Sequence, residues 1–364
     1  MKNDMNATRY YGEKLSSYAK SFRELSFKVD ADPNIILNYL DLPAVNFILS
    51  DCNSTTVERT HYLEAFSYGD PGVLLACPGP SLSGLMLREL GLPNQIDYFY
   101  KILQSKKIRT FFALTEPNKG SDANNIQTRL TKKNKHDSDY FLNGTKCFFG
   151  NGAVGNMGIV LARLFDGPLG IRAVWLTPDL LNNNLNIQKT SLSMFALKSA
   201  QIALVKFNDV KIPESQILGN HLSACENGLL GIVKVFNRLR TGVGALAIGQ
   251  AQAVCDITFL INKANLKSLK SVFANFNSLL KVSRQMLKNA ASEVDKNALL
   301  CRNVSLAKAN ATAISEKVIS ACIALCKMDA LLENPWLLKA LRDVHCWEYM
   351  EGTTDIQKKQ IRGI

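Results

Sequence analysis

The chain has 364 residues, which is enough for two or three domains and a sizeable core. Its 47% hydrophobic and 20% charged residues are typical of an ordinary globular protein, and no apolar run approaches the roughly 18 residues of a membrane span. The net charge of +12 is uneven: residues 221–364 carry 19 Lys/Arg against 11 Asp/Glu, whereas residues 1–112 carry 12 of each.

This charge distribution favours an acidic partner, although a solvated lysine-rich surface explains it equally well. Nucleic-acid binding is not expected, because no basic helix motif or aromatic interleaving accompanies the charge. The N-terminus lacks the apolar segment of a secretory signal, and the nine cysteines are scattered without CxxC spacing. We therefore expect reduced thiols, a cytoplasmic location and no structural metal site.

The first 110 residues have a mainly helical pattern, and the spacing of apolar residues predicts helices over 10–25 and 62–70. The segment "CPGPSLSG" (77–84) is typical of a loop. A strand pattern then runs from about 109 to 212, with turns expected at 142–145, 166–170 and 207–210. The predicted strands are 109–115, 140–149, 157–165, 171–177 and 201–212.

After Pro213 the pattern becomes helical again. The small residues of 242–253 indicate closely packed helices, and a long amphipathic helix is predicted over 266–287. Its core-facing residues would be Leu266, Leu269, Phe273, Phe276 and Leu280. The whole order predicts an α+β protein with a helical domain (1–110), a β-domain (111–220) and a helical bundle (221–364).

Four motifs occur in one order along the chain: "ALTEPNKGSD" (113–122), "LNGTKCFFGNG" (142–152), "VKFNDVKIP" (205–213) and "LRDVHCWEYMEGTTDIQ" (341–357). Arg240 precedes "ALAIGQAQA" between the last two. In this combination the chain resembles the acyl-CoA dehydrogenase family. The resemblance implies an N-terminal α-helical domain, a middle β-domain and a C-terminal four-helix bundle that enclose FAD, with oligomerisation completing the flavin site.

The implied reaction removes an α-proton and a β-hydride from an acyl thioester. Side chains cannot accept hydride, so a flavin must, and a carboxylate must take the proton. By resemblance Glu351 is this base, with a pKa raised by burial. Ser121, Arg240 and Gly352 would bind substrate together with Glu351. Leu239 occupies the family's alternative position for the base and cannot take a proton.

The resemblance also assigns residues to the cofactor. The 112–115 segment would lie along the isoalloxazine ring, and Ser121 would reach pyrophosphate or pantetheine. An aromatic residue would shield the flavin, and a glycine stands where the family often has a hydroxyl near N5. The last segment would approach the adenosine part. The residues are Phe112, Leu114, Thr115, Ser121, Phe148, Gly150, Thr353, Asp355 and Gln357.

Two elements by which the family reaches a neighbouring subunit's FAD are absent. Asn265, Ser268 and Leu269 align with the family's Arg, Phe and Gly, and "IALCKMDALLEN" (323–334) replaces a glycine-rich run. Either Lys263, Lys267 and Lys270 substitute for the arginine, or another subunit supplies the grip, or FAD is held weakly. A homodimer or homotetramer is expected, and a hetero-oligomer is the alternative.

The leading hypothesis is therefore FAD-dependent α,β-dehydrogenation of an acyl thioester, carried by CoA or by an acidic acyl carrier protein. The electron acceptor is not indicated. A non-catalytic relative that binds an acidic partner is the main alternative, and a flavin oxidase or monooxygenase on the same fold is a third.

Overall fold

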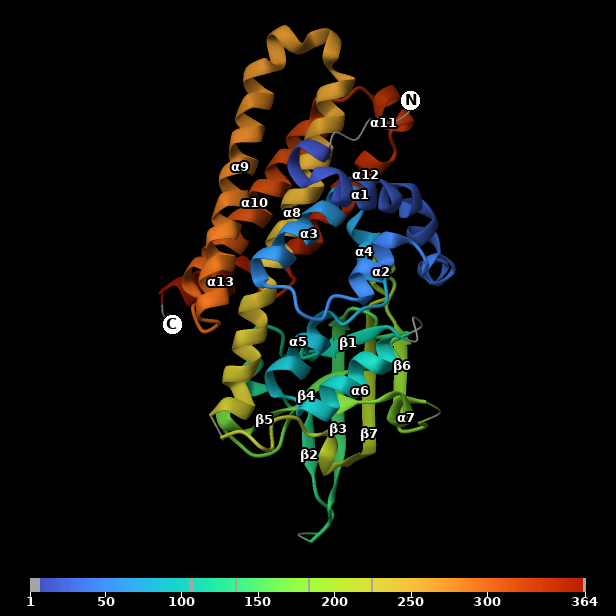
Figure 1. The fold of residues 1–364 in the computed structure, drawn as a ribbon, viewed down its shortest axis with the longest axis vertical. Coiled ribbons are helices and arrows are strands. Elements are labelled where there is room, and N and C mark those ends of the chain that lie inside the picture. Colours follow the sequence, from blue (N-terminus) through green and yellow to red (C-terminus); the bar gives the residue numbers. More distant parts are fainter. Residues whose placement is uncertain (1–6, 105–107, 135, 183, 224, 363–364) are drawn as a thin grey trace.

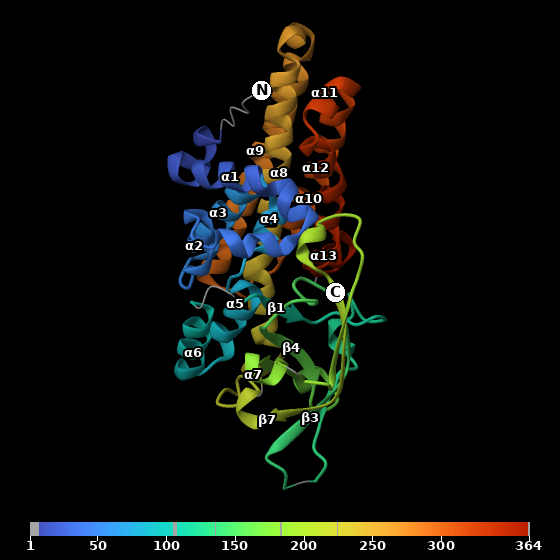
Figure 2. The same ribbon diagram turned by 90° about the vertical axis from the view of Figure 1, so that its right-hand side faces the viewer.

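The computed structural model describes residues 7–104, 108–134, 136–182, 184–223 and 225–362. A bundle of long helices forms one end of the elongated molecule, a β-sheet forms the other, and the N-terminal helices pack along the side of the bundle (Figure 1). The view turned by 90° shows the same division (Figure 2).

The N-terminal part is helical. Helix α3 begins with a capping box, in which Thr55 accepts from the backbone N–H of Glu58 and the Glu58 carboxylate accepts from the backbone of Thr55. Helix α6 lies over the sheet (Figure 1), and the ring of its Tyr98 meets that of Trp175 edge to face at 5.9 Å. The helices are α1 (Thr8–Ala31), α2 (Pro43–Leu49), α3 (Thr56–Gly69), α4 (Pro71–Ala76), α5 (Ser81–Leu90) and α6 (Pro93–Leu103).

The middle part is one seven-stranded sheet among the described residues, in the order β1-β4-β2-β3-β7-β6, with β5 paired to β4. Strands β1 and β4 are parallel, and the pairs β3–β7, β6–β7 and β4–β5 are antiparallel. The strands are β1 (Thr110–Ala113), β2 (Arg129–Thr131), β3 (Asp139–Phe149), β4 (Met157–Arg163), β5 (Ile171–Leu176), β6 (Ile187–Ser191) and β7 (Ala203–Pro213), with the short helix α7 (Pro178–Leu181) between β5 and β6.

Strand β1 is buried on both faces, and its alternation decides which side chain faces the helices. Phe111 lies in a core enclosed by the sheet, where its ring packs 5.6 Å from that of Phe149. Phe112 points the other way and joins the core shared with the helices. A shift of one residue would exchange the two rings, so this register places Phe112 against the helical part.

Two predicted turns are wrong. Residues 142–145 and 207–210 lie inside β3 and β7, which run on as paired strands with a bulge between Leu142 and Gly144. Gly144 has φ +147°, and a Cβ there would lie 2.5 Å from Thr128 Oγ1. Asn143 and Asp209 exchange side-chain and backbone hydrogen bonds of 2.8 Å across the bulge. The Asn-Gly and Asn-Asp signals therefore mark an irregular pair of strands, not chain reversals.

The C-terminal part is built on three long helices, with α13 packed against α10 as the fourth. Helix α8 crosses α3 so closely that a Cβ at Gly249 would lie 2.1 Å from the Glu64 carbonyl oxygen. This confirms the close packing predicted for 242–253. The helices are α8 (Gly231–Ile261), α9 (Leu266–Lys296), α10 (Arg302–Ala324), α11 (Met328–Glu333), α12 (Trp336–Val344), the short η8 (His345–Glu348) and α13 (Thr354–Arg362).

Of the residues predicted to face the core in α9, Phe273, Phe276 and Leu280 are buried and Leu269 is partly buried. The side chain of Leu266 lies outside the described part. Residues 81–84, predicted as loop, form the first turn of α5 instead, because the loop ends at Pro80. One helical stretch of the described chain, Glu226–Ile261, is long and apolar enough to span a membrane, but 72% of its most apolar segment is buried inside the protein, as in a core helix.

The α+β architecture, with N-terminal helices, a middle sheet and C-terminal helices, is confirmed.

Candidate functional site

The turn between η8 and α13 carries Glu351 in a strained conformation. Glu351 has φ +55° and Gly352 has φ +94°, in the region that L-residues rarely adopt. The Arg240 Nε on α8 donates to the Glu351 carbonyl oxygen at 3.1 Å. The Gln357 Nε2 on α13 donates to the carbonyl oxygens of Glu351 and Gly352 at 3.0 and 3.1 Å. Such strain persists only where the surroundings hold it, and it concentrates at functional sites.

The carboxyl group of Glu351 has no donor at one oxygen. The residue as a whole is half-buried, but its Oε2 is shielded from solvent and has no hydrogen-bond partner among the described residues. Burial raises the pKa of Glu351 to about 7, although the nearby charges of Arg240 and Lys308 lower it. A carboxyl group of this kind can take or give a proton near neutrality.

Arg240 is buried and connects this turn to the sheet. Its guanidinium lies over the Phe236 ring, 5.9 Å from the centroid, and that ring meets Phe112 of β1 edge to face at 5.8 Å. The Nη1 atom also donates to Asn237 Oδ1 at 2.9 Å. Burial lowers the pKa of Arg240, and Glu351 opposes that shift. Phe112, Arg240 and Glu351, far apart in the sequence, are thus joined by continuous contacts.

The segment after β1 is held against β3. The Lys146 Nζ donates to the Leu114 carbonyl oxygen at 2.8 Å, and the Cys147 backbone N–H donates to the Thr115 carbonyl oxygen at 2.9 Å. Leu114 and Thr115 remain half-buried at the end of the strand. Their backbone is therefore fixed by β3.

Glu116, the residue after Thr115, is buried and structural. Its carboxylate accepts from the backbone N–H groups of Gln127 and Thr128 at 2.6 and 2.8 Å and from the Lys146 Nζ at 2.8 Å. Burial alone would raise the pKa of Glu116, but the Lys146 ammonium and these donors hold it below its ordinary value. The Glu116 carboxylate of the "ALTEPNKGSD" motif is thus hydrogen-bonded within the protein, where it holds the segment that follows β1.

Phe148 stands out from the end of β3. A second register shift against β7 falls between Cys147 and Phe149, and Phe148 within it has φ +57° and is 62% exposed. Gly150 beside it is exposed, and a Cβ there would have room, 3.8 Å from the Ala200 carbonyl oxygen. The bulge thus holds an aromatic ring in solvent at a cost in backbone strain, and such strain is concentrated at functional sites.

Other predicted site residues lie outside this contact network. Ser121 and Asp355 are exposed, and Asp355 faces Lys358 at 3.7 Å on α13. Thr353 is half-buried at the start of α13, where its hydroxyl accepts from the Ile356 backbone N–H at 3.5 Å. Their roles stay predictions. The side chain of Asn265 lies outside the described part of the chain.

The structure adds three residues that the motifs did not single out as functional: Glu116, Lys146 and Lys308. Lys308 is fully buried in α10, and its Nζ donates to the carbonyl oxygens of Glu348 and Gly352 at 3.0 and 2.8 Å. A lysine among small and apolar residues in "SLAKANATA" (305–313) was the only sequence signal for it. Among the described residues no group of three or more His, Cys, Asp and Glu side chains could hold a metal ion.

These features fit a flavin. Leu114 and Thr115 form a half-buried edge beside β3 next to the buried Phe112, Phe148 presents an exposed ring, and the buried Oε2 of Glu351 has no donor among the described residues. The family description "Acyl-CoA dehydrogenase, middle domain" matches residues 111–210, and "Acyl-CoA dehydrogenase, C-terminal domain" matches residues 226–363.

Individual proteins agree with this match. The chain is 25% identical to a probable medium-chain specific acyl-CoA dehydrogenase 2 of Caenorhabditis briggsae, over 84% of this chain and 74% of the relative. It is also 25% identical to the caffeyl-CoA reductase-Etf complex subunit CarC of Acetobacterium woodii, over 81% and 78%. The solved butyryl-CoA dehydrogenase of Megasphaera elsdenii superimposes with a TM-score of 0.83 over 99% of this chain and 98% of that one, at 22% identity. The chain belongs to the acyl-CoA dehydrogenase family of FAD-dependent oxidoreductases.

Proposed function

We propose that the protein catalyses α,β-dehydrogenation of an acyl-CoA thioester, in which Glu351 takes the proton from Cα and the hydrogen on Cβ leaves as a hydride. The single observation that carries the proposal is the Glu351 carboxyl group, buried at Oε2 without a donor and with a pKa raised to about 7. An acid that only stabilised the fold would be paired, as Glu116 is.

The rest of the turn supports binding of a thioester carbonyl. Within the described residues, no hydrogen bond from the Glu351 backbone N–H is present, while the carbonyl oxygens of Glu351 and Gly352 are held by Arg240, Gln357 and Lys308. The free N–H is therefore available for the oxygen that becomes negative when the α-proton leaves. Arg240 and Gly352 act here by shaping the turn.

FAD, held in part by the 112–115 segment, Phe148 and the Gly150 backbone, would accept the β-hydrogen with its electron pair. Ser121, Thr353, Asp355 and Gln357 are proposed to contact the cofactor's pyrophosphate and adenosine parts, and Ser121 the pantetheine as well. Gln357 is buried and its Oε1 lacks a partner among the described residues, which leaves it an acceptor for a ligand donor.

The direction of the reaction belongs to the proposal. The relatives include a subunit of a caffeyl-CoA reductase complex as well as dehydrogenases. By microscopic reversibility the residue that takes the α-proton in oxidation returns it in reduction, and a pKa near 7 suits both roles. We propose oxidation as the assayed direction, with CoA as the carrier. An acyl carrier protein is the alternative carrier. We also propose a cytoplasmic location, which the nine free cysteines support because disulfides are rare in the cytosol.

The test compares Glu351→Gln with the wild type in two assays. With a thioester analogue that cannot lose a β-hydrogen, the wild type should exchange the α-hydrogen for deuterium from D₂O, and the variant should not. With a range of saturated acyl-CoAs under anaerobic conditions, the visible flavin absorbance should fall in the wild type and persist in the variant. Unchanged exchange in the variant would move the base to another residue. Absence of both reactions in flavin-loaded wild type would favour the non-catalytic alternative.

A further inference from the structure

Three lysines of the described chain are buried, and Lys308 differs from the other two. Lys146 lies 2.8 Å from the Glu116 carboxylate, and Lys339 lies 2.9 and 2.8 Å from those of Asp70 and Asp343. Lys308 has no side-chain exposure, yet both of its acceptors are neutral backbone carbonyls. Burying an ammonium whose hydrogen-bond acceptors are all neutral is costly, so its position needs a reason beyond packing.

That position is the inside of the Glu351 turn. The carbonyls that Lys308 binds, those of Glu348 and Gly352, lie on either side of Glu351. Gly352 can keep φ +94°, but a Cβ there would meet Gln357 Nε2 at 2.8 Å, so the turn has little freedom on its α13 side. Lys308 on α10 restrains the turn through its hydrogen bonds to the carbonyl oxygens, and Arg240 on α8 does so through its own hydrogen bond to the Glu351 carbonyl oxygen.

Among the described residues, the charged groups that act on Lys308 and Glu351 are Arg240 on α8 and Glu348 on η8, besides Lys308 on α10 and Glu351 themselves. Glu348 is occupied, since it accepts from the Thr354 backbone N–H and hydroxyl at 2.6 Å each. Glu351 is not. Burial lowers the pKa of Lys308 to about 8, while Glu348 and Glu351 raise it and Arg240 lowers it further.

We propose that Lys308 is a positioning residue for Glu351, which fixes the turn through the carbonyls of Glu348 and Gly352 and stabilises the Glu351 carboxylate with a buried positive charge. The inference rests on the proposed function of Glu351. Removing the charge should make the Glu351 carboxylate harder to form. Removing the two hydrogen bonds should let the carboxyl leave its reactive orientation.

The test compares Lys308→Met, Lys308→Arg and the control Lys189→Met in the flavin-loaded enzyme. Lys189 also donates to a backbone carbonyl, that of Gly155 at 2.8 Å, but it lies in the sheet away from Glu351. In Lys308→Met the acidic limb of the pH profile for oxidation should move to higher pH. Its kcat should fall at least about tenfold with KM changed much less, as expected when the base rather than substrate binding is affected. Lys308→Arg should keep the limb near its wild-type pH, and Lys189→Met should leave both kcat and the limb unchanged.

A second measurement does not depend on turnover. Thermal unfolding at pH 8 is compared for Lys308→Met, Glu351→Gln and the double variant. If the cation acts on the Glu351 charge, Lys308→Met should lower Tm less in the Glu351→Gln background than in the wild type. Equal losses in both backgrounds, with an unmoved pH limb, would overturn the inference even if Glu351→Gln is inactive. Coupling in Tm together with an active Glu351→Gln would instead refute the proposed function of Glu351 and the positioning role with it.

Discussion

Glu351 links the ionisation of one side chain to the stability of the fold. Its carboxyl has a pKa of about 7 in the folded protein, against an ordinary value of 4.5, because burial disfavours the charged form. The protonated form therefore contributes stability that is fully present below about pH 4.5 and is lost as the pH rises through about 7. This is opposite to the usual behaviour of a paired acid such as Glu116.

The first prediction is that Glu351→Gln stabilises the protein at alkaline pH. The neutral amide keeps the shape of the side chain and removes the charge, so the free energy of unfolding at pH 8 should exceed that of the wild type by about 1–3 kcal/mol. At about pH 4.5 the two proteins should be nearly equal. Denaturant unfolding at both values measures this, with the exposed Glu333→Gln as the control for net charge. Equal stability of Glu351→Gln and the wild type at pH 8 would contradict this prediction, because it would show that ionisation of Glu351 does not lower the free energy of unfolding.

The sequence could locate Glu351 and Arg240 because each stands inside a short motif. It could not predict which residues hold the Glu351 turn and the segment after β1 in place. Lys308 reaches Gly352 across 44 residues, and Glu116 is joined to Lys146 across 30. Such contacts depend on which helix or strand folds back beside the motif, and an isolated lysine among small residues carries no sign of that.

At the scale of elements, the crossing of α3 and α8 holds the helix that carries Arg240. Gly249 permits this approach, since its Cα faces the Glu64 carbonyl oxygen directly. The Ser67 hydroxyl on α3 also donates to the Leu246 carbonyl oxygen, so the two helices are joined by a side-chain hydrogen bond as well as by packing. The orientation of Arg240 thus depends on a contact between two helices about two turns away.

The second prediction is that Gly249→Ala separates these helices. Its methyl group would lie 2.1 Å from a backbone oxygen, which cannot move like a side-chain end, so we expect a loss of about 2–4 kcal/mol in stability. Gly242→Ala on the same helix is the control, because its methyl would meet only the movable Leu63 Cδ1, at 2.7 Å. The measurement is the thermal unfolding of Gly249→Ala and Gly242→Ala, and the prediction requires a larger loss of stability in Gly249→Ala. Equal small effects would show that α3 and α8 can move apart freely.

Element types were predictable where the pattern is long, as in α9, and where strands are bounded by real turns, as at 166–170 between β4 and β5. The errors at 142–145 and 207–210 have one cause. Asn-Gly and Asn-Asp sequences are compatible with a hairpin turn and with a β-bulge. Only the pairing of β3 with β7 shows that they form a bulge here. Two strands were missed: β2, because three residues are too few for a period, and β6, because four of its five residues are exposed and show no apolar alternation.

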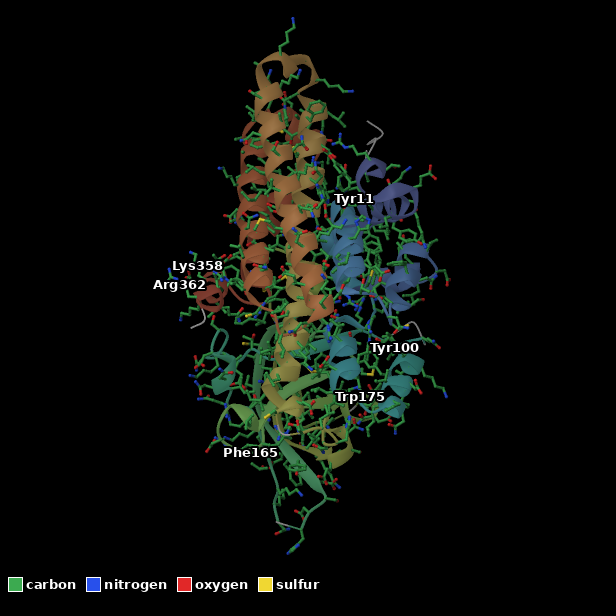
Figure 3. All side chains as sticks on the ribbon, turned by 60° about the vertical axis from the view of Figure 1, so that its left-hand side comes forward. Tyr11, Tyr100, Phe165, Trp175, Lys358 and Arg362 are labelled. Atoms are coloured by element: carbon green, nitrogen blue, oxygen red, sulfur yellow. The ribbon has the colours of Figure 1, made fainter. Side chains whose placement is uncertain are left out.

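At the scale of the whole molecule, the uneven charge gives the third prediction. Lys358 and Arg362 lie on the outer side of α13, at the basic C-terminal end (Figure 3). If this end attracts the phosphates of the acyl carrier, kcat/KM should fall as salt rises, because exposed charges are screened beyond about 8–10 Å at physiological ionic strength.

Lys358→Glu with Arg362→Glu should flatten that salt dependence. The control is Lys20→Glu with Lys101→Glu, two exposed lysines of the N-terminal part, which makes the same change in net charge. Stopped-flow kinetics at several salt concentrations, with CoA and carrier-protein thioesters, provide the measurement. A salt-independent wild type with both substrates would contradict a steering role for the charge.

The last prediction concerns how FAD is retained when two inter-subunit elements of the family are replaced. Lys263, Lys267 and Lys270 are exposed where α8 turns into α9, at the far end of the helical bundle (Figure 1). To take the arginine's place, they would have to meet the FAD of a neighbouring copy at this end. A lysine is a point charge and lacks the paired donors of arginine. If these lysines hold FAD in a homo-oligomer, the complex should bind FAD measurably, but less tightly than with an arginine.

We expect the chain expressed alone to form an oligomer that keeps FAD through gel filtration. Changing all three lysines to alanine should weaken FAD binding about tenfold or more, since each charge-assisted hydrogen bond contributes about 1.5–3 kcal/mol. Lys281→Ala with Lys288→Ala, exposed on the same helix, should not. Apoprotein that takes up FAD only after a second, different subunit is added would show that the partner, and not these lysines, completes the site.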